Sequence, residues 1–397
     1  MSELSYLEKL LDGVEVEWLP LGEVSALRRG RVMSKGYLTE NFGPYPVYSS
    51  QTANNGKIGS INTFDFDGEY ISWTTDGANA GTVFYRTGKF SITNVCGLIT
   101  LKSKYPLIYK FLFYWLTIEA KKHVYSGMGN PKLMSHQVEN IPVPIPCPDN
   151  PEKSLAIQSE IVRILDKFSA LTAELTAELN MRKKQYNYHR DKLLNFKDIA
   201  GGGNYILPDA MDGIRIEWKT LGEVAVIGTG NHDTQDAIEH GKYIFYARGR
   251  EPLKLNVFDF DETAIITAGD GAGVGKVFHY AKGKYALHQR AYRIVPNAFM
   301  NPRFVYHYIT AYFFTYIQKA SVSSSVTSLR RPMFLKFPIP VPPSEEQARI
   351  VEILDKFDTL TNSITEGLPR EIELRQKQYE YYRDLLFSFP KPETVSN

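Results

Sequence analysis

One glycine-rich segment of this sequence is the strongest candidate for phosphate chemistry. Residues 269–276 read GDGAGVGK, a run of small residues that ends in lysine. A loop that binds nucleotide phosphates needs the spacing G-x4-G-K-[ST], so that backbone amides and the lysine surround the phosphate while the hydroxyl binds Mg²⁺. Here Val277 follows the lysine, and the register fails. Because DGANAG at 76–81 is a similar segment, we predict a turn between strands at both places.

The other residues that could perform catalysis or bind metal form no working pattern. The eight histidines contain no HExxH pair, and Cys96 and Cys147 are too few for a thiolate metal site. There is no GxSxG nucleophile motif. The segment NPRF at 301–304 only approaches the Asn-Pro-Pro-aromatic motif of amino-group DNA methyltransferases. We therefore predict no catalytic residue, no metal and no cofactor in this chain; any chemistry would come from another chain.

Side chains that could contact a nucleic acid gather at matching places in the two halves of the chain. Residues 101–138 hold six Lys or Arg against one acid, and residues 301–344 hold five and no acid. Basic, amide and hydroxyl groups donate to phosphates and to base edges. In the first half the candidates for DNA contact are Arg28, Arg29, Arg31, Lys35, Ser49, Asn54, Lys57, Asn130 and Lys132. In the second half they are Asn231, His232, Arg248, Arg250, His288, Gln289, Arg290, Ser324, Thr327, Arg330 and Arg331.

The elements that must position these side chains are written twice. Residues 12–24 and 212–224 share 8 of 13 positions, and residues 161–172 and 350–361 share 9 of 12. A third repeat shares 9 of 15 positions between residues 182–196 and 375–389. The segments that follow the LGEV motif, 25–63 and 225–257, share almost nothing. Repeated flanking motifs around two dissimilar segments favour a duplicated recognition protein with two different targets over a duplicated enzyme.

Each copy has the same order of expected elements. Short apolar runs broken by Gly, Asn, Asp and Thr predict β-strands. An aromatic-rich helix follows, at about 107–122 and 303–319. The proline strips IPVPIP (141–146) and FPIPVP (337–342) lack the amide donors of a central strand, so we expect extended linkers. Each copy ends in a long amphipathic helix.

The terminal helices carry an apolar seam that predicts a coiled coil. Its members step by three and four residues and are Ile157, Ile161, Ile164, Phe168, Leu171 and Leu175 in the first copy, and Ile350, Ile353, Phe357, Leu360 and Ile364 in the second. About 40 helical residues would make a rod of roughly 60 Å. Packing of each helix on its own domain is the simpler alternative, but the helix of the other copy is the most available partner. Pro369 should kink the second helix or begin a new one.

The whole-chain composition is that of a globular protein. Of the 397 residues, 43% are hydrophobic and 23% are charged, with 46 basic against 44 acidic side chains. Two cysteines and no apolar run of 18 residues lead us to expect a soluble, cytoplasmic protein. The predicted fold class is α+β: two β-rich domains joined by two long helices, packed as an antiparallel coiled coil with internal pseudo-twofold symmetry. The predicted boundaries are a domain at 1–150, a helix at 151–200, a domain at 201–343, a helix at 344–390 and a tail at 391–397.

The set of repeated motifs resembles the specificity subunits of type I restriction-modification systems over nearly the whole chain. The motifs are EW-x2-LGEV at 17–24 and 217–224, the two proline strips, the ILDKF seam, the RxKQYxYxRDxL tail and the spacer at 364–372. The resemblance implies two target recognition domains, each reading one half of an interrupted DNA target. It implies that the helices set the gap between the half-sites and dock two modification subunits. Those partners would bind S-adenosylmethionine and methylate adenine, and motor-nuclease restriction subunits would cleave double-stranded DNA.

Two other functions fit parts of the sequence. A protein-interaction scaffold with two β-rich adaptors on a coiled-coil rod would also need a duplicated frame, but its binding would not weaken with salt. A degenerate enzyme that has kept its fold would need a closed pocket for a small ligand. The locally basic, divergent fillings favour the DNA-specificity subunit.

Overall fold

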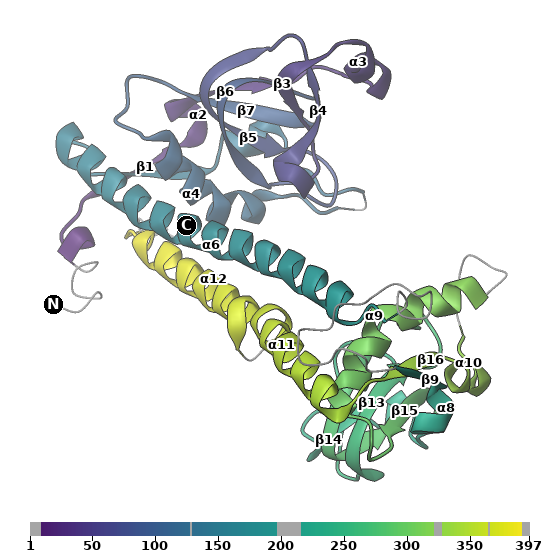
Figure 1. The fold of residues 1–397 in the computed structure, drawn as a ribbon. Coiled ribbons are helices and arrows are strands. Elements are labelled where there is room, and N and C mark those ends of the chain that lie inside the picture. Colours follow the sequence, from purple (N-terminus) through teal and green to yellow (C-terminus); the bar gives the residue numbers. More distant parts are fainter. Residues whose placement is uncertain (1–8, 128, 197–215, 321–327, 364–365, 391–397) are drawn as a thin grey trace. The chain divides into compact units, whose positions relative to one another are not determined.

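A computed structural model of the protein describes residues 9–127, 129–196, 216–320, 328–363 and 366–390 (Figure 1). Contacts divide the chain into two compact units, residues 1–174 with 372–397 and residues 175–371. Each unit contains one β-rich domain together with helical segments. In the described part of the chain, no helix combines the length and the apolar character that a membrane crossing requires.

The first domain is built on a six-stranded sheet in the order β2-β7-β5-β6-β3-β4. Its neighbouring strands are antiparallel except for β3 and β6, which are parallel. The strands are β2 (Ser25–Arg29), β3 (Phe42–Tyr48), β4 (Lys57–Ile61), β5 (Phe66–Thr74), β6 (Val83–Ile92) and β7 (Cys96–Leu101). The helices are α2 (Leu21–Val24), α3 (Lys35–Glu40), α4 (Tyr109–Glu119) and α5 (Ser135–Val138), with the 3-10 turns η1 (Ala53–Gly56) and η2 (Ala120–His123).

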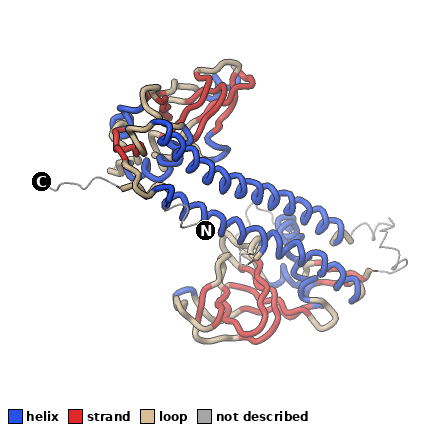
Figure 2. The backbone as a smooth tube through the Cα atoms, turned by 90° about the vertical axis from the view of Figure 1, so that its left-hand side faces the viewer, coloured by secondary structure: helices blue, strands red, loops and turns tan. Residues whose placement is uncertain are grey.

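The second domain repeats this sheet in the order β10-β15-β13-β14-β11-β12, again with one parallel pair, β11 with β14. The strands of both domains are red in Figure 2. The strands of the second domain are β10 (Ala225–Thr229), β11 (Tyr243–Tyr246), β12 (Leu253–Leu255), β13 (Phe260–Ala268), β14 (Phe278–Leu287) and β15 (Ala291–Pro296). The helices are α8 (Leu221–Val224), η3 (Thr234–Asp236), α9 (Pro302–Ala320) and α10 (Arg331–Leu335). The prediction of two β-rich domains on one common frame is confirmed.

The proline strips are strands and not linkers, so that expectation was wrong. In the first domain β8 (Pro142–Pro146) pairs antiparallel with β1 (Val16–Pro20), and in the second β16 (Pro338–Val341) pairs with β9 (Glu217–Thr220). Successive amides of a strand point to opposite edges. Proline at every second position therefore removes donors from one edge, while the intervening residues keep theirs for the ladder. The strip can pair on one side only, which makes it a two-stranded edge.

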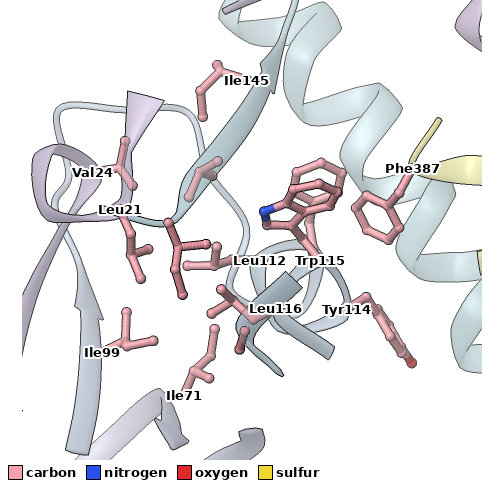
Figure 3. Packing of buried hydrophobic residues seen from close by; sticks show 14 of the residues in the cluster. Leu21, Val24, Ile71, Ile99, Leu112, Tyr114, Trp115, Leu116, Ile145 and Phe387 are labelled. Carbon is pink, nitrogen blue, oxygen red and sulfur yellow. The ribbon is translucent and has the colours of Figure 1, made fainter. Parts of the chain in front are cut away.

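The core of the first unit lies between the sheet, α4 and the helices that follow. Figure 3 shows Ile71 and Ile99 of the sheet facing Leu112 and Leu116 of α4, all 1% exposed or less. Trp115 lies on the far side of α4, with its ring 5.7 Å from that of Phe387. The residue that closes this core thus comes from the C-terminal end of the chain.

Three long helices complete the two units. They are α6 (Pro151–Leu193), α11 (Ser344–Asn362) and α12 (Gly367–Leu386). The second and third are separated at the predicted break, where Gly367 has φ +77° and Pro369 lies in the first turn of α12. Proline at this place starts a new helix, because a first-turn residue has no intrahelical partner for its missing N–H.

Each unit pairs the first part of one copy's helix with the last part of the other copy's helix. In the first unit α6 and α12 run side by side in opposite directions (Figures 1 and 2), and the Phe168 and Tyr382 rings stack at 5.2 Å. In the second unit Phe357 of α11 stacks on His189 of α6 at 5.3 Å. Phe168 corresponds to Phe357 and Tyr382 to His189 in the repeated sequence. The same contact is therefore built twice.

The apolar seam serves two surfaces. Of its predicted members, Ile157 and Ile161 are buried in the core of the first domain and Ile350 in that of the second. Leu165 and Leu354, which the predicted seam did not include, are buried in the same two cores. Phe168 and Phe357 contact the partner helix, whereas Ile164, Leu171, Leu175, Ile353 and Leu360 are partly exposed. Ile364 lies outside the described residues. Both readings of the seam hold: the helix begins on its own domain and then turns its stripe to the other helix.

One aspartate in each ILDKF segment joins the aromatic helix of the domain to the long helix. In the first unit Asp166 contacts Lys110 at 2.6 Å and accepts a hydrogen bond from Tyr114 at 2.7 Å. In the second unit Asp355 contacts Arg303 at 2.6 Å and His307 at 2.7 Å. Desolvation alone would raise the pKa of Asp355, but hydrogen bonds from His307 and Arg303 more than offset it and hold the pKa below its ordinary value.

Replacing Asp355 by Asn should lower the free energy of unfolding by about 1–2 kcal/mol. A fully buried pair costs about 3–5 kcal/mol when one partner is removed, but the Asp355 side chain is 36% exposed and solvent screens it. A depressed carboxyl pKa stabilises the fold above the unfolded value of about 3.9, and this contribution is lost as the pH falls through the folded-state pKa. Thermal unfolding at neutral pH should separate the two proteins, and the difference should disappear as the pH falls through the lowered folded-state pKa of Asp355. Asp166→Asn, with more exposed partners, is the matched control. Equal stability of the wild type and Asp355→Asn at neutral pH would contradict a stabilising role for the contacts of Asp355 with Arg303 and His307.

Candidate nucleic-acid interface

Loops from four places in the first domain meet at one edge of its sheet. Thr93 N donates to Tyr48 O at 2.9 Å, and Thr75 N donates to Val95 O at 3.1 Å. A parallel bridge joins Arg31 to Thr93. These contacts bring together the ends of β2, β3, β5 and β6, of which β2 and β3 lie in the divergent segment 25–63.

A short hairpin after α4 completes this edge. Tyr125 and Lys132 exchange backbone hydrogen bonds of 2.9 and 3.0 Å, which closes the hairpin. Gly77 N donates to Pro131 O at 3.0 Å, and a bridge joins Asp76 to Lys132. The hairpin is thus fixed to the loop after β5. We name the whole set the first loop edge; its segments are 30–32, 48–56, 75–81, 93–95, 125–127 and 129–132.

The second domain has equivalent contacts between its strand ends and the segment after α9. His288 N donates to Tyr246 O at 3.0 Å, Gly269 N to Arg290 O at 2.8 Å and Leu329 N to Gly269 O at 2.7 Å. Bridges join His232 to His288 and Asp270 to Ser328. The second loop edge therefore has the segments 230–233, 246–251, 269–275, 288–290 and 328–330.

The glycine-rich segments are turns between strands, as predicted. The segment at 269–276 connects β13 to β14, and its counterpart at 76–81 connects β5 to β6. Gly77 and Gly271 have φ of +90° and +82°, a backbone conformation that glycine adopts without strain. At Gly275 an added Cβ would lie 2.5 Å from the side chain of Ile317, so this glycine also lets the turn approach α9.

A buried arginine that the sequence analysis missed fixes the longest loop of the first edge. The Arg86 side chain is 3% exposed, lies 3.6 Å over the Tyr48 ring and donates to Asn55 O at 2.8 Å. Burial lowers the pKa of Arg86 to about 10, so it stays protonated at neutral pH. The signal was its place in β6, where alternation puts it on the same face as Phe84 and Phe90.

His279 has the same task in the second edge. His279 occupies the position in β14 that Phe84 occupies in β6, because each pairs with the equivalent residue of the neighbouring strand. Its Nε2 lies 3.0 Å from Gly249 O. Because a carbonyl only accepts hydrogen bonds, Nε2 must carry the proton. Burial holds the pKa of His279 below its ordinary value, which keeps the imidazole neutral. Each domain therefore stabilises its variable loop from the neighbouring strand.

A charged hollow lies at the second loop edge. It has a volume of about 500 Å³ and is lined by the side chains of Arg248, Arg250, Lys276 and Asp270 and by the turn at 271–273. A second hollow of about 230 Å³ adjoins it, with Asp270 and Arg290 among its lining residues. Three cations against one acid favour a phosphate or another anion in the larger hollow.

Asp270 holds two of the arginines in place. Its carboxylate accepts from Arg248 Nη1 at 2.8 Å and from Arg290 Nη1 at 3.1 Å. Desolvation would raise the pKa of Asp270, but these two hydrogen bonds outweigh it and lower the pKa below the ordinary value. The aspartate is therefore ionised at neutral pH, and the three side chains carry one net positive charge.

The structure brings most candidates of the first half together. Within or next to the first loop edge lie Arg29, Arg31, Ser49, Asn54, Lys57, Asn130 and Lys132. Arg31 is already paired with Asp65 at 3.0 Å, and Ser49 bonds Thr93 at 2.8 Å, so these two hold the edge in shape. Arg28 lies within β2 and Lys35 begins α3, outside the loop edge.

The structure also brings most described candidates of the second half together. Asn231, Arg250, Arg290, Arg330 and Arg331 are exposed on or beside the second loop edge. Gln289 donates to Asp233 at 2.9 Å, and His232 lies 3.0 Å from Asp259. His288 is 1% exposed and accepts from Arg290 N, so a direct DNA contact does not fit it; it shapes the turn instead. Ser324 and Thr327 lie outside the described residues.

Over the ranges that the structure describes, no group of three or more His, Cys, Asp or Glu side chains could hold a metal ion. The loop edges instead present cations, amides and hydroxyls on turns that backbone hydrogen bonds hold together. Such an arrangement can bind a phosphate backbone and donate to base edges.

Comparisons with known proteins agree with this arrangement. A family model described as the type I restriction modification DNA specificity domain matches twice, at residues 13–182 and 215–374. The specificity subunit of the type I restriction enzyme EcoR124I/EcoR124II of Escherichia coli is 40% identical, over 100% of both chains. A putative type I specificity subunit of Mycoplasma pneumoniae, S.MpnORF507P, is 32% identical over 96% of this chain and 100% of its own.

A solved structure has the same fold. The crystal structure of the type I restriction-modification system S subunit from M. genitalium matches with a TM-score of 0.67 at 17% identity, over 96% of this chain and 98% of that one. The predicted resemblance is confirmed, and with it the role of a non-catalytic specificity component that works within a complex and binds DNA. The chain belongs to the family of type I restriction-modification DNA specificity subunits.

Proposed function

We propose that the two loop edges read the two halves of a bipartite, asymmetric DNA target. Each edge sits on the same six-stranded frame and is closed by the same backbone hydrogen bonds. A homodimer presents two identical surfaces and suits a palindrome, whereas two different surfaces in one chain suit two different half-sites.

The observation that carries this proposal is the difference between side chains at equivalent positions of the two edges. Ser50 lies two residues after Tyr48, the last residue of β3, and Arg248 lies two residues after Tyr246, the last residue of β11. Val95 and Arg290 both accept the hydrogen bond from the residue that precedes the turn. A frame that is kept while its exposed side chains change is what two DNA specificities require.

Phosphate contacts would position each domain on the duplex. The hollow lined by Arg248, Arg250 and Lys276 suits a backbone phosphate, and exposed Lys57 and Lys132 supply cations to the first edge. Such contacts fix register and carry no sequence information. Reading of bases would then fall to the side chains at the centre of each edge.

The long helices would set the gap between the half-sites and dock the modification subunits. Two pairs of large apolar side chains, seven residues apart, are exposed at equivalent positions of the repeat: Met181 and Tyr188 on α6, and Leu374 and Tyr381 on α12. A stripe of this spacing lies on one helix face and suits a partner helix. Two equivalent stripes support two modification subunits per chain.

The partners would supply the chemistry in the cytoplasm, where chromosomal DNA lies. Modification subunits of this kind would bind S-adenosylmethionine and methylate adenine within the target. Restriction subunits would add the motor and the nuclease. This chain would contribute the choice of sequence.

Mapping methylated adenines in the host genome tests this function. A strain that carries the chain should show methylation at one bipartite motif with a fixed gap, and a strain that lacks the gene should lose that motif while other methylation is unchanged. Restoring the gene on a plasmid is the control. Identical methylation in both strains would contradict the proposal.

A further inference from the structure

The two loop edges use one aspartate in different settings. Asp76 and Asp270 occupy the same place in the frame, because each begins the glycine turn and bridges the loop after the aromatic helix. In the second domain Asp270 binds Arg248 and Arg290. In the first domain the two equivalent positions hold Ser50 and Val95, and Oδ1 of Asp76 has no hydrogen-bond partner among the described residues. The paired arginines are therefore a feature of the second half-site reader alone.

The Nε and Nη2 groups of the Arg290 guanidinium are available for a further contact. Its contact with Asp270 runs through Nη1, and among the described residues no other side-chain hydrogen bond occupies its Nε or Nη2. The Arg290 side chain is 63% exposed, whereas Arg248 is 39% exposed and Asp270 23%. The aspartate thus lies beneath the pair, and the outer guanidinium faces solvent.

An arginine held in this way suits a base edge better than a phosphate. A carboxylate between two arginines cancels one of their charges and weakens attraction to the DNA backbone in general. What it adds is direction, because the planar guanidinium loses its freedom to rotate. Fixed direction matters for two parallel donors that must meet two acceptors on one base. Guanine presents this pair, O6 and N7, in the major groove.

We propose that Arg290, oriented by Asp270, reads a guanine in the half-site of the second domain. Arg248 shares the carboxylate and completes the support from the neighbouring loop. This inference rests on the proposed function and deepens it, since it names one base of one half-site. Asp270 acts as a positioning residue, and Arg290 makes the contact.

Selection from a pool of duplexes with randomised sequence tests the assignment. The full-length chain, assembled with its modification subunits, is used as wild type and as the variants Arg290→Lys, Asp270→Asn and Asp76→Asn. Arg290→Lys keeps the charge and removes the planar fork, while Asp270→Asn keeps the shape and removes the charge that orients Arg290. Asp76→Asn makes the same change at the equivalent position of the other domain. A thermal melt of each variant checks folding, and Arg290→Lys decides alone if Asp270→Asn does not fold.

We expect the wild type to select a bipartite motif with an invariant guanine in the half that belongs to the second domain. Arg290→Lys and Asp270→Asn should each reduce discrimination for that guanine by about tenfold or more, with the other half-site unchanged. Asp76→Asn should leave the guanine preference intact. A second half-site without an invariant guanine would overturn this inference and leave the bipartite function standing. A uniform loss of affinity with an unchanged motif would identify Arg290 as a phosphate contact and overturn it too, and selection of no motif would overturn both.

Discussion

Exchange of residues 25–140 for the matching segment of a relative with a different target should change one half-site and leave the other as it was. The segment begins at β2 and ends before the proline strand β8, so it carries the whole six-stranded sheet and the first loop edge. The two-stranded sheet of β1 and β8, the long helices and the second domain stay in place. Each changed base pair costs about 1–3 kcal/mol, so two changes would lower affinity for the old target about 30-fold or more.

Methylation mapping of the chimera measures this result directly. The donor must keep a cation at position 110 and a hydroxyl at 114, because these groups join α4 to Asp166. The reciprocal exchange of residues 225–336 is the matched control and should change the other half-site. A chimera in which both half-sites change would contradict modular reading, and so would one in which neither changes.

Binding to the bipartite duplex should weaken by about 10³- to 10⁵-fold between 50 and 200 mM salt, as for a protein with roughly 6–10 phosphate contacts. The physical reason is release of counterions when cations of the protein neutralise phosphates. The exposed cations available at the edges include Lys57, Lys132, Arg250, Arg330 and Arg331. Fluorescence anisotropy with labelled DNA over a series of salt concentrations gives the slope of log affinity against log salt.

Single charge removal divides this effect into its parts. Lys276, which lines the larger hollow, should contribute about one unit of the slope, so Lys276→Gln should flatten it by that amount for all sequences alike. Lys356→Gln on α11, far from the loop edges in sequence and paired with Glu352, is the control and should leave the slope unchanged. Affinity that is independent of salt would point to a protein-interaction scaffold instead.

The repeated frame could be predicted from sequence because repetition and periodicity are local properties. The duplicated motifs gave two β-rich domains, the turn at 269–276 followed from its failed phosphate-loop spacing, and Pro369 fell at the start of a helix. The proline strip was predicted to be a linker because the prediction considered how many amide donors are missing. It did not consider that the prolines alternate with residues that keep their amide donors. The alternation leaves one edge able to pair.

The supports of the loop edges could not be predicted in this way. Arg248, Asp270 and Arg290 lie on three loops, and only the parallel pairing of β11 with β14 and the turn after β13 bring them together. Arg86 looks like an ordinary strand residue until its buried contact with Asn55 is seen. Single-sequence patterns find the exposed groups that could touch DNA but not the buried groups that aim them.

The exchanged helix ends have a consequence for how such a chain can arise. Leu386, Phe387 and Phe389, from the end of the second copy, complete the core of the first domain, and Leu194 and Phe196, from the end of the first copy, complete that of the second. A single copy therefore cannot close its own core. A gene encoding one repeat would yield a protein that must find a twin and trade C-terminal segments with it, as in domain swapping. Fusion of two such genes would then allow each half to evolve its own specificity. A protein that recognises a palindromic DNA target would become one that recognises two different half-sites.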